Sequence, residues 1–352
     1  MLRMTDAQSK TSIRILRRVL RWYFGEVYGK SEGPGTVPFY CDPGRVGHFA
    51  VDKRDVAAGS EAALFRMFVT FAMFQARRDV LIMGQQRGMV RAAARSLTSV
   101  RVLRRYIAHS CCEHVESADG FDAGCSVRKS RGVVDCDRHP NAPCHVKDGT
   151  RHLRRMGDMG KLPTSAWLHV WSAGGVSQLL AAVLDQEPDP QRRADLLVDR
   201  FSRIHRVGSK LATMYVSALS TPSLANGAAP WFPRVDGSAL VVVDTNVARA
   251  VTTLCGPGYA RTYAAQAGWL REKARAIDLG EFRADVPRFS PRLVQQSLYA
   301  FCSKSNRVAT NARCARPREC PAVLLCPFCS GEDEGPTRSR SGTRSVACFG
   351  RW

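Results

Sequence analysis

The sequence predicts an all-α protein on the evidence of three helical patterns. Residues 11–28 form an amphipathic pattern in which arginines surround an apolar side. Residues 61–80 are apolar nearly all round, which is typical of a buried core helix. After Gly208 the apolar residues recur with the spacing of one helical face: Leu211, Met214, Tyr215, Ala218 and Leu219.

Length and charge limit the class of protein. The chain has 352 residues, 45% of them hydrophobic, which is enough for about two domains with buried cores. Its formal net charge of +21 attracts polyanions, of which nucleic acid is the commonest. An anionic membrane is the competing partner, but no run approaches the roughly 18 apolar residues of a spanning helix. Residues 1–10 lack the apolar core of a signal peptide, so we expect a cytoplasmic, nucleoid-associated protein.

Residues 1–59 are expected to form an N-terminal basic helix and an irregular segment. The helix over 11–28 either docks on a core with its basic face solvated or extends a DNA-facing surface. Residues 30–60 are rich in Gly and Pro, which predicts an irregular connection. Ser60 is expected to cap the core helix that follows, with Glu61 in its first turn.

A run of arginines follows the core helix on a helical background. It is either a solvated face or a surface that lines DNA. Its members are Arg87, Arg91, Arg95, Arg101, Arg104 and Arg105.

The thirteen cysteines favour metal binding, because a reducing compartment and an odd count both disfavour a disulfide framework. Eight Cys and His residues gather in an expected insertion over 110–147: Cys111, Cys112, His114, Cys125, Cys136, His139, Cys144 and His145. The last four have ligand-like spacing, which predicts a zinc site. The alternative is an ordinary loop with free thiols.

The stretch from Phe201 to Ser220 predicts a helix, a tight turn and a second helix that begins at Gly208. A helix N-terminus binds anions, and glycine lets a partner approach the backbone, so phosphate is the expected ligand. The segment 243–249, VDTNVAR, follows a Pro-, Gly- and Asn-containing loop over 221–237 and begins another helix.

These two motifs, IHRVGSKLA over 204–212 and VDTNVAR over 243–249, resemble the helix–hairpin–helix and the catalytic-aspartate loop of the endonuclease III and 8-oxoguanine glycosylase superfamily. The resemblance covers about 60–80 and 160–300. It implies a two-lobed core over 60–301 with the DNA cleft between the lobes, Lys210 as Schiff-base nucleophile and Asp244 as catalytic carboxylate. Arg206 replaces the first hairpin glycine of the family, and the connection between the two motifs is longer than usual. The DNA contacts it implies are Gln75, Arg206, Val207, Gly208, Ser209 and Arg249.

The residues at these positions suit that chemistry. A neutral lysine amine attacks a sugar carbon, and a carboxylate stabilises a developing sugar cation or carries protons. The structural alternatives are a phosphate contact for Lys210, an N-cap for Asp244 and a polar helix end for Gln75.

A second cysteine group lies in an expected loop over 302–329, before a tail over 330–352 that is expected to be disordered. Ser290 and Pro291 should start the helix before it. Cys314, Cys320, Cys326 and Cys329 could hold zinc or an iron–sulfur cluster. Many endonuclease III relatives carry a 4Fe–4S cluster at this place, so the resemblance favours that cofactor, although the spacing differs and Cys302 could replace one ligand.

The resemblance therefore implies a DNA glycosylase that flips a damaged or modified base out of double-stranded DNA, with AP lyase activity through Lys210, and we expect it to be a monomer. One alternative is a monofunctional glycosylase that uses Asp244 and water. The other is a non-catalytic helix–hairpin–helix protein that only grips phosphate.

Overall fold

The computed structural model describes residues 6–75, 77–110, 112–142, 144–153, 159–225, 227–256, 262–309 and 322–326. The chain is mostly helical, with 66% helix and 3% strand, so the all-α prediction is confirmed at that level. It divides into two compact units. The C-terminal tail over 330–352, like Cys314, Cys320 and Cys329, lies outside the described residues.

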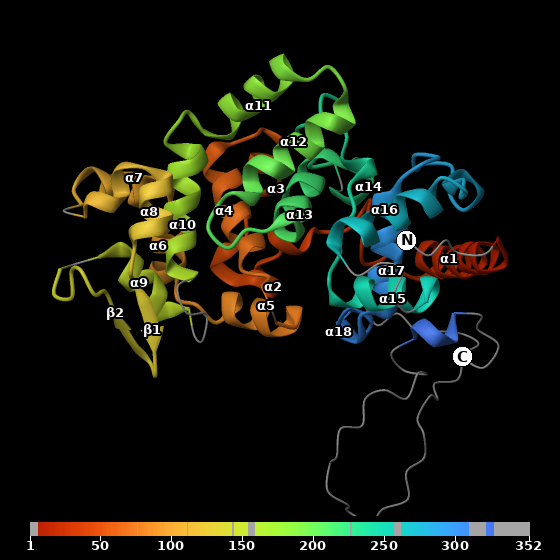
Figure 1. Cartoon of the computed structure of the whole chain (residues 1–352), viewed down its shortest axis with the longest axis horizontal. Coiled ribbons are helices and arrows are strands. Elements are labelled where there is room, and N and C mark those ends of the chain that lie inside the picture. Colours follow the sequence, from red (N-terminus) through yellow and green to blue (C-terminus); the bar gives the residue numbers. More distant parts are fainter. Residues whose placement is uncertain are drawn as a thin grey trace, which may run out of the picture. The chain divides into compact units, whose positions relative to one another are not determined.

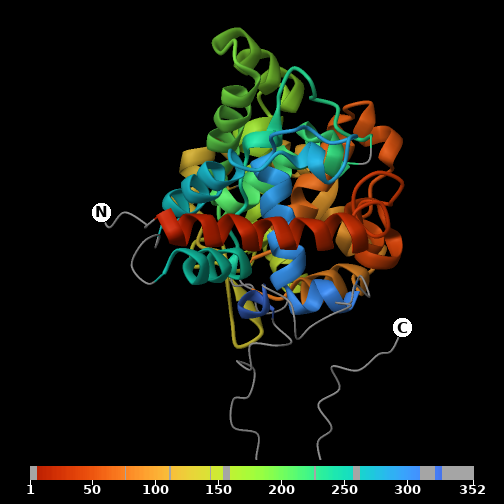
Figure 2. The ribbon, with the colours of Figure 1, turned by 90° about the vertical axis from the view of Figure 1, so that its right-hand side faces the viewer.

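The first unit joins Met1–Thr36 to Val241–Trp352. In Figure 2 its long helix α1 (Asp6–Glu26) runs across α17 (Pro291–Cys302), and Trp22 meets Phe301 edge-on at 5.1 Å between ring centroids. Ser290 caps α17 as predicted, because its hydroxyl accepts from Leu293 N–H at 3.3 Å. The remaining elements are α15 (Thr245–Cys255), α16 (Tyr263–Ala274), η7 (Leu279–Glu281), α18 (Lys304–Ala309) and η8 (Val323–Leu325).

The second unit is Val37–Leu240, and the helices α4, α12 and α13 lie in its middle (Figure 1). Its first part is less irregular than predicted, since it forms η1 (Phe39–Cys41), α2 (Pro43–Val46), η2 (Gly47–Phe49) and α3 (Lys53–Ala57). Then follow α4 (Glu61–Ala72), α5 (Asp79–Arg87), α6 (Arg91–Thr98), α7 (Val100–Ala108), η3 (Glu113–Glu116), α8 (Ala118–Gly124), β1 (Arg128–Ser130), β2 (Val133–Asp135) and α9 (His145–His152). The last are η4 (Met159–Lys161), α10 (Leu162–Ala166), η5 (Trp167–Trp171), α11 (Gly175–Gln186), α12 (Pro190–Ser202), α13 (Ser209–Ser220), α14 (Pro222–Ala225) and η6 (Gly237–Ala239).

An aromatic cluster fixes α12 and α13 onto the core helix α4. Tyr215 of α13 is fully buried, and its ring lies 5.1 Å from Phe68 of α4 and 5.0 Å from Phe201 of α12. Its hydroxyl donates to Leu64 O at 3.1 Å, so burial leaves no polar group unsatisfied there. Each such ring contributes roughly 1.5–3 kcal/mol by burial. The helical hairpin is therefore held rigidly on α4.

Two predicted helical stretches differ in extent from their patterns: one ends early and the other is interrupted. The apolar helix stops at Ala72, because Phe74 N–H bonds back to Phe71 O in a tighter last turn and the Gln75 amide satisfies Ala72 O. Ser60 precedes it without a side-chain cap. The arginine-rich stretch is divided among three helices: Arg87 ends α5, and α6 and α7 follow. The break between α6 and α7 is at Ser99, which is extended and whose hydroxyl caps α7 by accepting from Val102 N–H at 3.4 Å.

Within the described residues no single helix has the length and apolar composition to cross a membrane. The segments Leu162–Trp171 and Gly175–Gln186 meet that criterion only when taken together, and they are bent by 50°.

Candidate functional site

The helix–turn–helix of α12 and α13 encloses a four-residue turn. Val207 N–H donates to Ile204 O at 2.8 Å, and Arg206, third in the turn, has a φ of +59°. That conformation favours glycine, which is what the glycosylase motif carries there. His205 N–H donates to Ser165 Oγ at 3.0 Å and ties the turn to α10. Arg206 therefore takes a glycine-type conformation.

The N-terminus of α13 is open to an anion. Gly208 is extended, with φ −78° and ψ 179°, and no side chain caps the helix. Ser209 and Lys210 are its first two residues, where backbone N–H groups have no partner inside the helix. The Val207 side chain is buried, so only its backbone is placed for a phosphate. A 12-residue helix adds its dipole to this site.

Lys210 reaches from α13 to the end of α4. Its side chain is partly buried, and Nζ donates to Phe74 O at 3.3 Å. Gln75, next in the chain, donates its amide to Ala72 O at 2.9 Å and to Arg206 O at 3.0 Å. Gln75 thus ties the turn to α4 in this structure. It is a structural contact here, which is the alternative that the sequence left open.

Asp244, in the other unit, is the N-cap of α15. Its Oδ1 accepts from Val247 N–H at 2.8 Å, and Asn246 Nδ2 lies 3.4 Å from Oδ2. The capping role expected as the structural alternative is thus present. Arg249, one turn further on, donates to Cys302 O at 3.5 Å across to the end of α17.

Of the four cysteines predicted for the iron–sulfur loop, only Cys326 lies in the described part of the chain. It is buried, and Arg307 Nη1 donates to its Sγ at 3.1 Å. Burial raises the pKa of the Cys302 thiol to about 12, and the charges of Asp244 and Cys326 act in the same direction while that of Arg249 opposes them. Cys302 and Cys326 are therefore neighbours in this unit, which keeps Cys302 a candidate ligand.

The arginines on α6 and α7 form an exposed basic face. It consists of Arg91, Arg95, Arg101, Arg104 and Arg105, all exposed, and in the described structure none of them pairs with a carboxylate. Unpaired, hydrated cations of one sign make a surface suited to phosphates.

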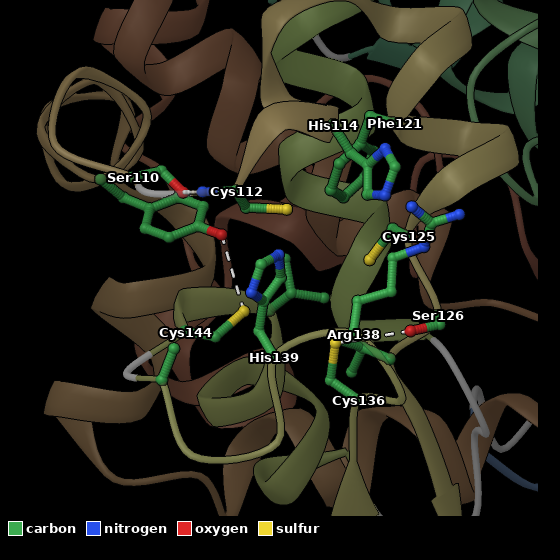
Figure 3. A pocket seen from close by; sticks show the side chains of 14 residues that line it. Ser110, Cys112, His114, Phe121, Cys125, Ser126, Cys136, Arg138, His139 and Cys144 are labelled. Atoms are coloured by element: carbon green, nitrogen blue, oxygen red, sulfur yellow. Dashed lines mark hydrogen bonds between the residues drawn. The ribbon is translucent and has the colours of Figure 1, made fainter.

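A cavity lies among the Cys and His residues of the expected insertion (Figure 3). It measures about 20 Å³, room for one water-sized particle and far too little for a nucleobase. Three of the four residues predicted as zinc ligands, Cys136, His139 and Cys144, line it. The sequence-based ligand set missed Cys112, His114 and Cys125, which line it as well.

His145, the fourth predicted ligand, is placed differently. It is the first residue of α9, does not line the cavity, and its ring packs against Tyr106 at 5.2 Å between centroids. Burial lowers its pKa. In the described residues no three His, Cys, Asp or Glu side chains are yet grouped closely enough to hold a metal ion.

Three comparisons with known proteins found no similar protein. No family model matches the chain, and neither a curated protein nor a solved structure matches it.

Proposed function

We propose that this protein is a helix–hairpin–helix DNA glycosylase that excises a damaged or modified base and then cuts the strand as an AP lyase. The observation that carries the proposal is the hairpin. Its turn takes a glycine-type conformation at Arg206, the N-terminus of α13 is uncapped, and Lys210 stands one residue inside that helix. The first two features suit a DNA phosphate, and the third puts an amine beside the bound strand.

Lys210 is the nucleophile in this proposal. Its neutral amine attacks C1′ of the flipped nucleotide, the bond from C1′ to the base breaks, and the base leaves with the electron pair and a proton. The bond from C1′ to the ring oxygen O4′ then breaks, and O4′ takes up a proton. This leaves an imine between Lys210 and C1′, which permits β-elimination of the 3′ phosphate. The hydrogen bond from Lys210 Nζ to Phe74 O directs the amine while it is at rest.

Asp244 supplies the carboxylate that stabilises positive charge on the sugar. Its cap bond to Val247 N–H holds the carboxylate in one orientation through Oδ1. A carboxylate fixed in this way needs little reorganisation when charge develops.

A monofunctional glycosylase is the second candidate, and the contact of Lys210 with Phe74 O favours it. If that hydrogen bond persists with DNA bound, Lys210 only positions the strand. Asp244 then activates water for attack at C1′, and no imine forms.

The proposal includes a 4Fe–4S cluster on the C-terminal cysteine loop, of which Cys326 is the one described ligand. Such a cluster with four thiolates is anionic, and the buried guanidinium of Arg307 already donates to Cys326 Sγ. Purified protein should contain about four iron atoms per chain and absorb in the visible blue, and Cys326→Ser should lose both. Colourless protein with zinc bound at this loop would refute the assignment.

A screen against duplexes that each carry one modified base tests the function. Release of a free base from one of them, followed by strand cleavage without alkali, is the result expected for the bifunctional enzyme. Cleavage only after alkali identifies the monofunctional one. Tight duplex binding with no base released from a panel of oxidised, alkylated, deaminated and mismatched bases would contradict both.

A further inference from the structure

The Cys/His module, which we define as residues 112–152, is too small to be ordered by its own core. Its buried apolar cluster consists of Val115, Phe121, Val127 and Val146 with the thiol-bearing Cys125 and Cys136. Tyr106, Ile107 and Leu168 from neighbouring elements also pack against it, and a segment of about 40 residues rarely folds on its own core without disulfides or a metal. The four described cysteines of the module, Cys112, Cys125, Cys136 and Cys144, form no disulfide.

We propose that the cavity of this module is a structural zinc site in which Cys112, Cys125, Cys136 and Cys144 are the four ligands. Figure 3 shows the four thiols around the cavity, and all four line it. Two of them, Cys112 and Cys125, were not in the ligand set expected from the sequence, and His145 of that set is not used.

Each thiol stands at the end of a secondary-structure element. Cys112 precedes η3, Cys125 follows α8, Cys136 follows β2 and Cys144 precedes α9. One ion bound to all four would therefore fix the ends of four elements at once, which is how a closed zinc site stabilises a small domain.

The β-hairpin brings two of these ends together. Arg131 and Gly132 form its two-residue turn, with φ of +48° and +89°. Arg128 pairs with Asp135, so the chain enters and leaves the hairpin side by side. Cys125 lies just before the hairpin and Cys136 directly after it, as two ligands on facing chains require.

The thiols already have the polar neighbours that bound thiolates need. Ser126 Oγ lies 3.4 Å from Cys136 Sγ, and Tyr106 Oη lies 3.6 Å from Cys144 Sγ. Once a thiol has lost its proton it can only accept, so each hydroxyl then donates to the sulfur. Such donors around a metal ligand hold its orientation and offset its charge.

The charge and the size of the site both select zinc. Four thiolates on a divalent ion carry a net charge of −2, and the buried ammonium of Lys147 is held beside them by His139 O and Pro140 O, each at 2.9 Å. The cavity of about 20 Å³ has room for one ion. Four thiolates in tetrahedral array are the donor set of structural zinc. In the described residues the four thiols are too far apart to share one ion. The proposal therefore requires them to move towards the zinc as it binds.

Zinc analysis of the full-length chain tests the proposal, with substitutions that separate this site from the C-terminal loop. Cys112→Ser and Cys125→Ser should each remove about one zinc per chain, the stoichiometry of a closed site. Cys41→Ser, a thiol in the same unit but outside the cavity, should keep the zinc. Cys326→Ser should keep it as well.

Thiol protection in the wild-type protein gives a readout that does not depend on folded variants. Cys112, Cys125, Cys136 and Cys144 should resist alkylation until a chelator is added, whereas Cys41 should show the same reactivity with and without it. Zinc retained in Cys125→Ser, or the same alkylation of the four thiols with and without chelator, would overturn the proposal. Zinc lost in His139→Ala but kept in Cys144→Ser would overturn the four-thiol ligand set.

Discussion

Asp244 has a visible structural role, so its catalytic role must be separated from capping. Asn caps a helix about as well as Asp, because its carbonyl oxygen accepts the same N–H. Asp244→Asn should therefore leave the free energy of unfolding nearly unchanged, while Asp244→Ala should lower it by about 1 kcal/mol. Both should excise bases far more slowly, because neither carries the negative charge. Denaturant unfolding measures the stability of the two variants, and single-turnover kinetics measures their excision rates. A normal excision rate in Asp244→Asn would show that Asp244 only caps α15.

Glu32 shows how burial makes stability depend on pH. Removal from water raises the pKa of this carboxyl above 4.5, although Gln296 Nε2 at 2.8 Å and Tyr23 Oη at 3.1 Å, with the charge of Arg292, act to lower it. The folded state therefore holds the proton more tightly than the unfolded state. The stability linked to this proton is full below pH 4.5 and is lost as pH rises through the raised pKa.

Glu32→Gln removes that titration. The melting temperature of Glu32→Gln minus that of wild type should therefore increase as pH rises from about 4 to 7, since only the wild type must ionise a buried carboxyl. Glu26→Gln, at an exposed position nearby, is the control. A difference for Glu32→Gln that stays constant over this range would show that Glu32 does not titrate as its surroundings require.

At the scale of elements, the hairpin turn stores strain at Arg206. A left-handed conformation costs a non-glycine residue about 1–2 kcal/mol, and glycine loses about 0.4–1 kcal/mol through its freer unfolded state. Arg206→Gly should thus raise the free energy of unfolding by about 0.5–1 kcal/mol. Arg203→Gly is the matched control, because Arg203 has φ −75° and glycine should destabilise there. A loss of stability in Arg206→Gly would mean that the turn differs from the one described.

The same scale shows what the sequence could and could not predict. The periodicity around Tyr215 predicts α13, and the Ser290–Pro291 pair predicts the start of α17, because these signals act within one helix. The break at Ser99 and the end of α4 at Ala72 depend on a single cap and on a bond from a later side chain. The ligand set proposed for the Cys/His module could not be predicted from spacing. The hairpin brings the chain at Cys125 and the chain at Cys136 side by side, and Cys112 lines the same cavity from a separate segment before η3.

At the scale of the whole chain, the N-terminal residues 1–36 form one compact unit with residues 241–352. The sequence indicated a basic amphipathic helix, and its pattern did not identify the partner. In the structure the partner of this helix is α17, and Trp22 of α1 packs against Phe301 of α17. Packing between segments far apart in the chain depends on the shapes of both surfaces, whereas periodicity describes only one of them.

The net charge of +21 predicts a steep salt dependence of duplex binding. The slope of log affinity against log salt should be about −0.9 for each phosphate contacted. Arg91→Gln with Arg95→Gln should make this slope shallower by up to about 2, because both arginines are exposed and unpaired. Arg151→Gln with Arg288→Gln removes the same charge from arginines paired with Asp148 and Asp278, and should change it less. Equal slopes for the two double variants would remove α6 and α7 from the DNA-binding surface.

Borohydride trapping on DNA tests the central claim most directly. An imine between Lys210 and C1′ is reduced by borohydride to a stable amine, so wild-type protein and a duplex with an abasic site should give a covalent complex. Lys210→Ala should form none while it still binds the duplex and keeps its helical content, and Lys53→Ala, at an exposed position in the same unit, should trap like wild type. Trapping that persists in Lys210→Ala, or base excision by wild type with no trapped complex, would contradict the account.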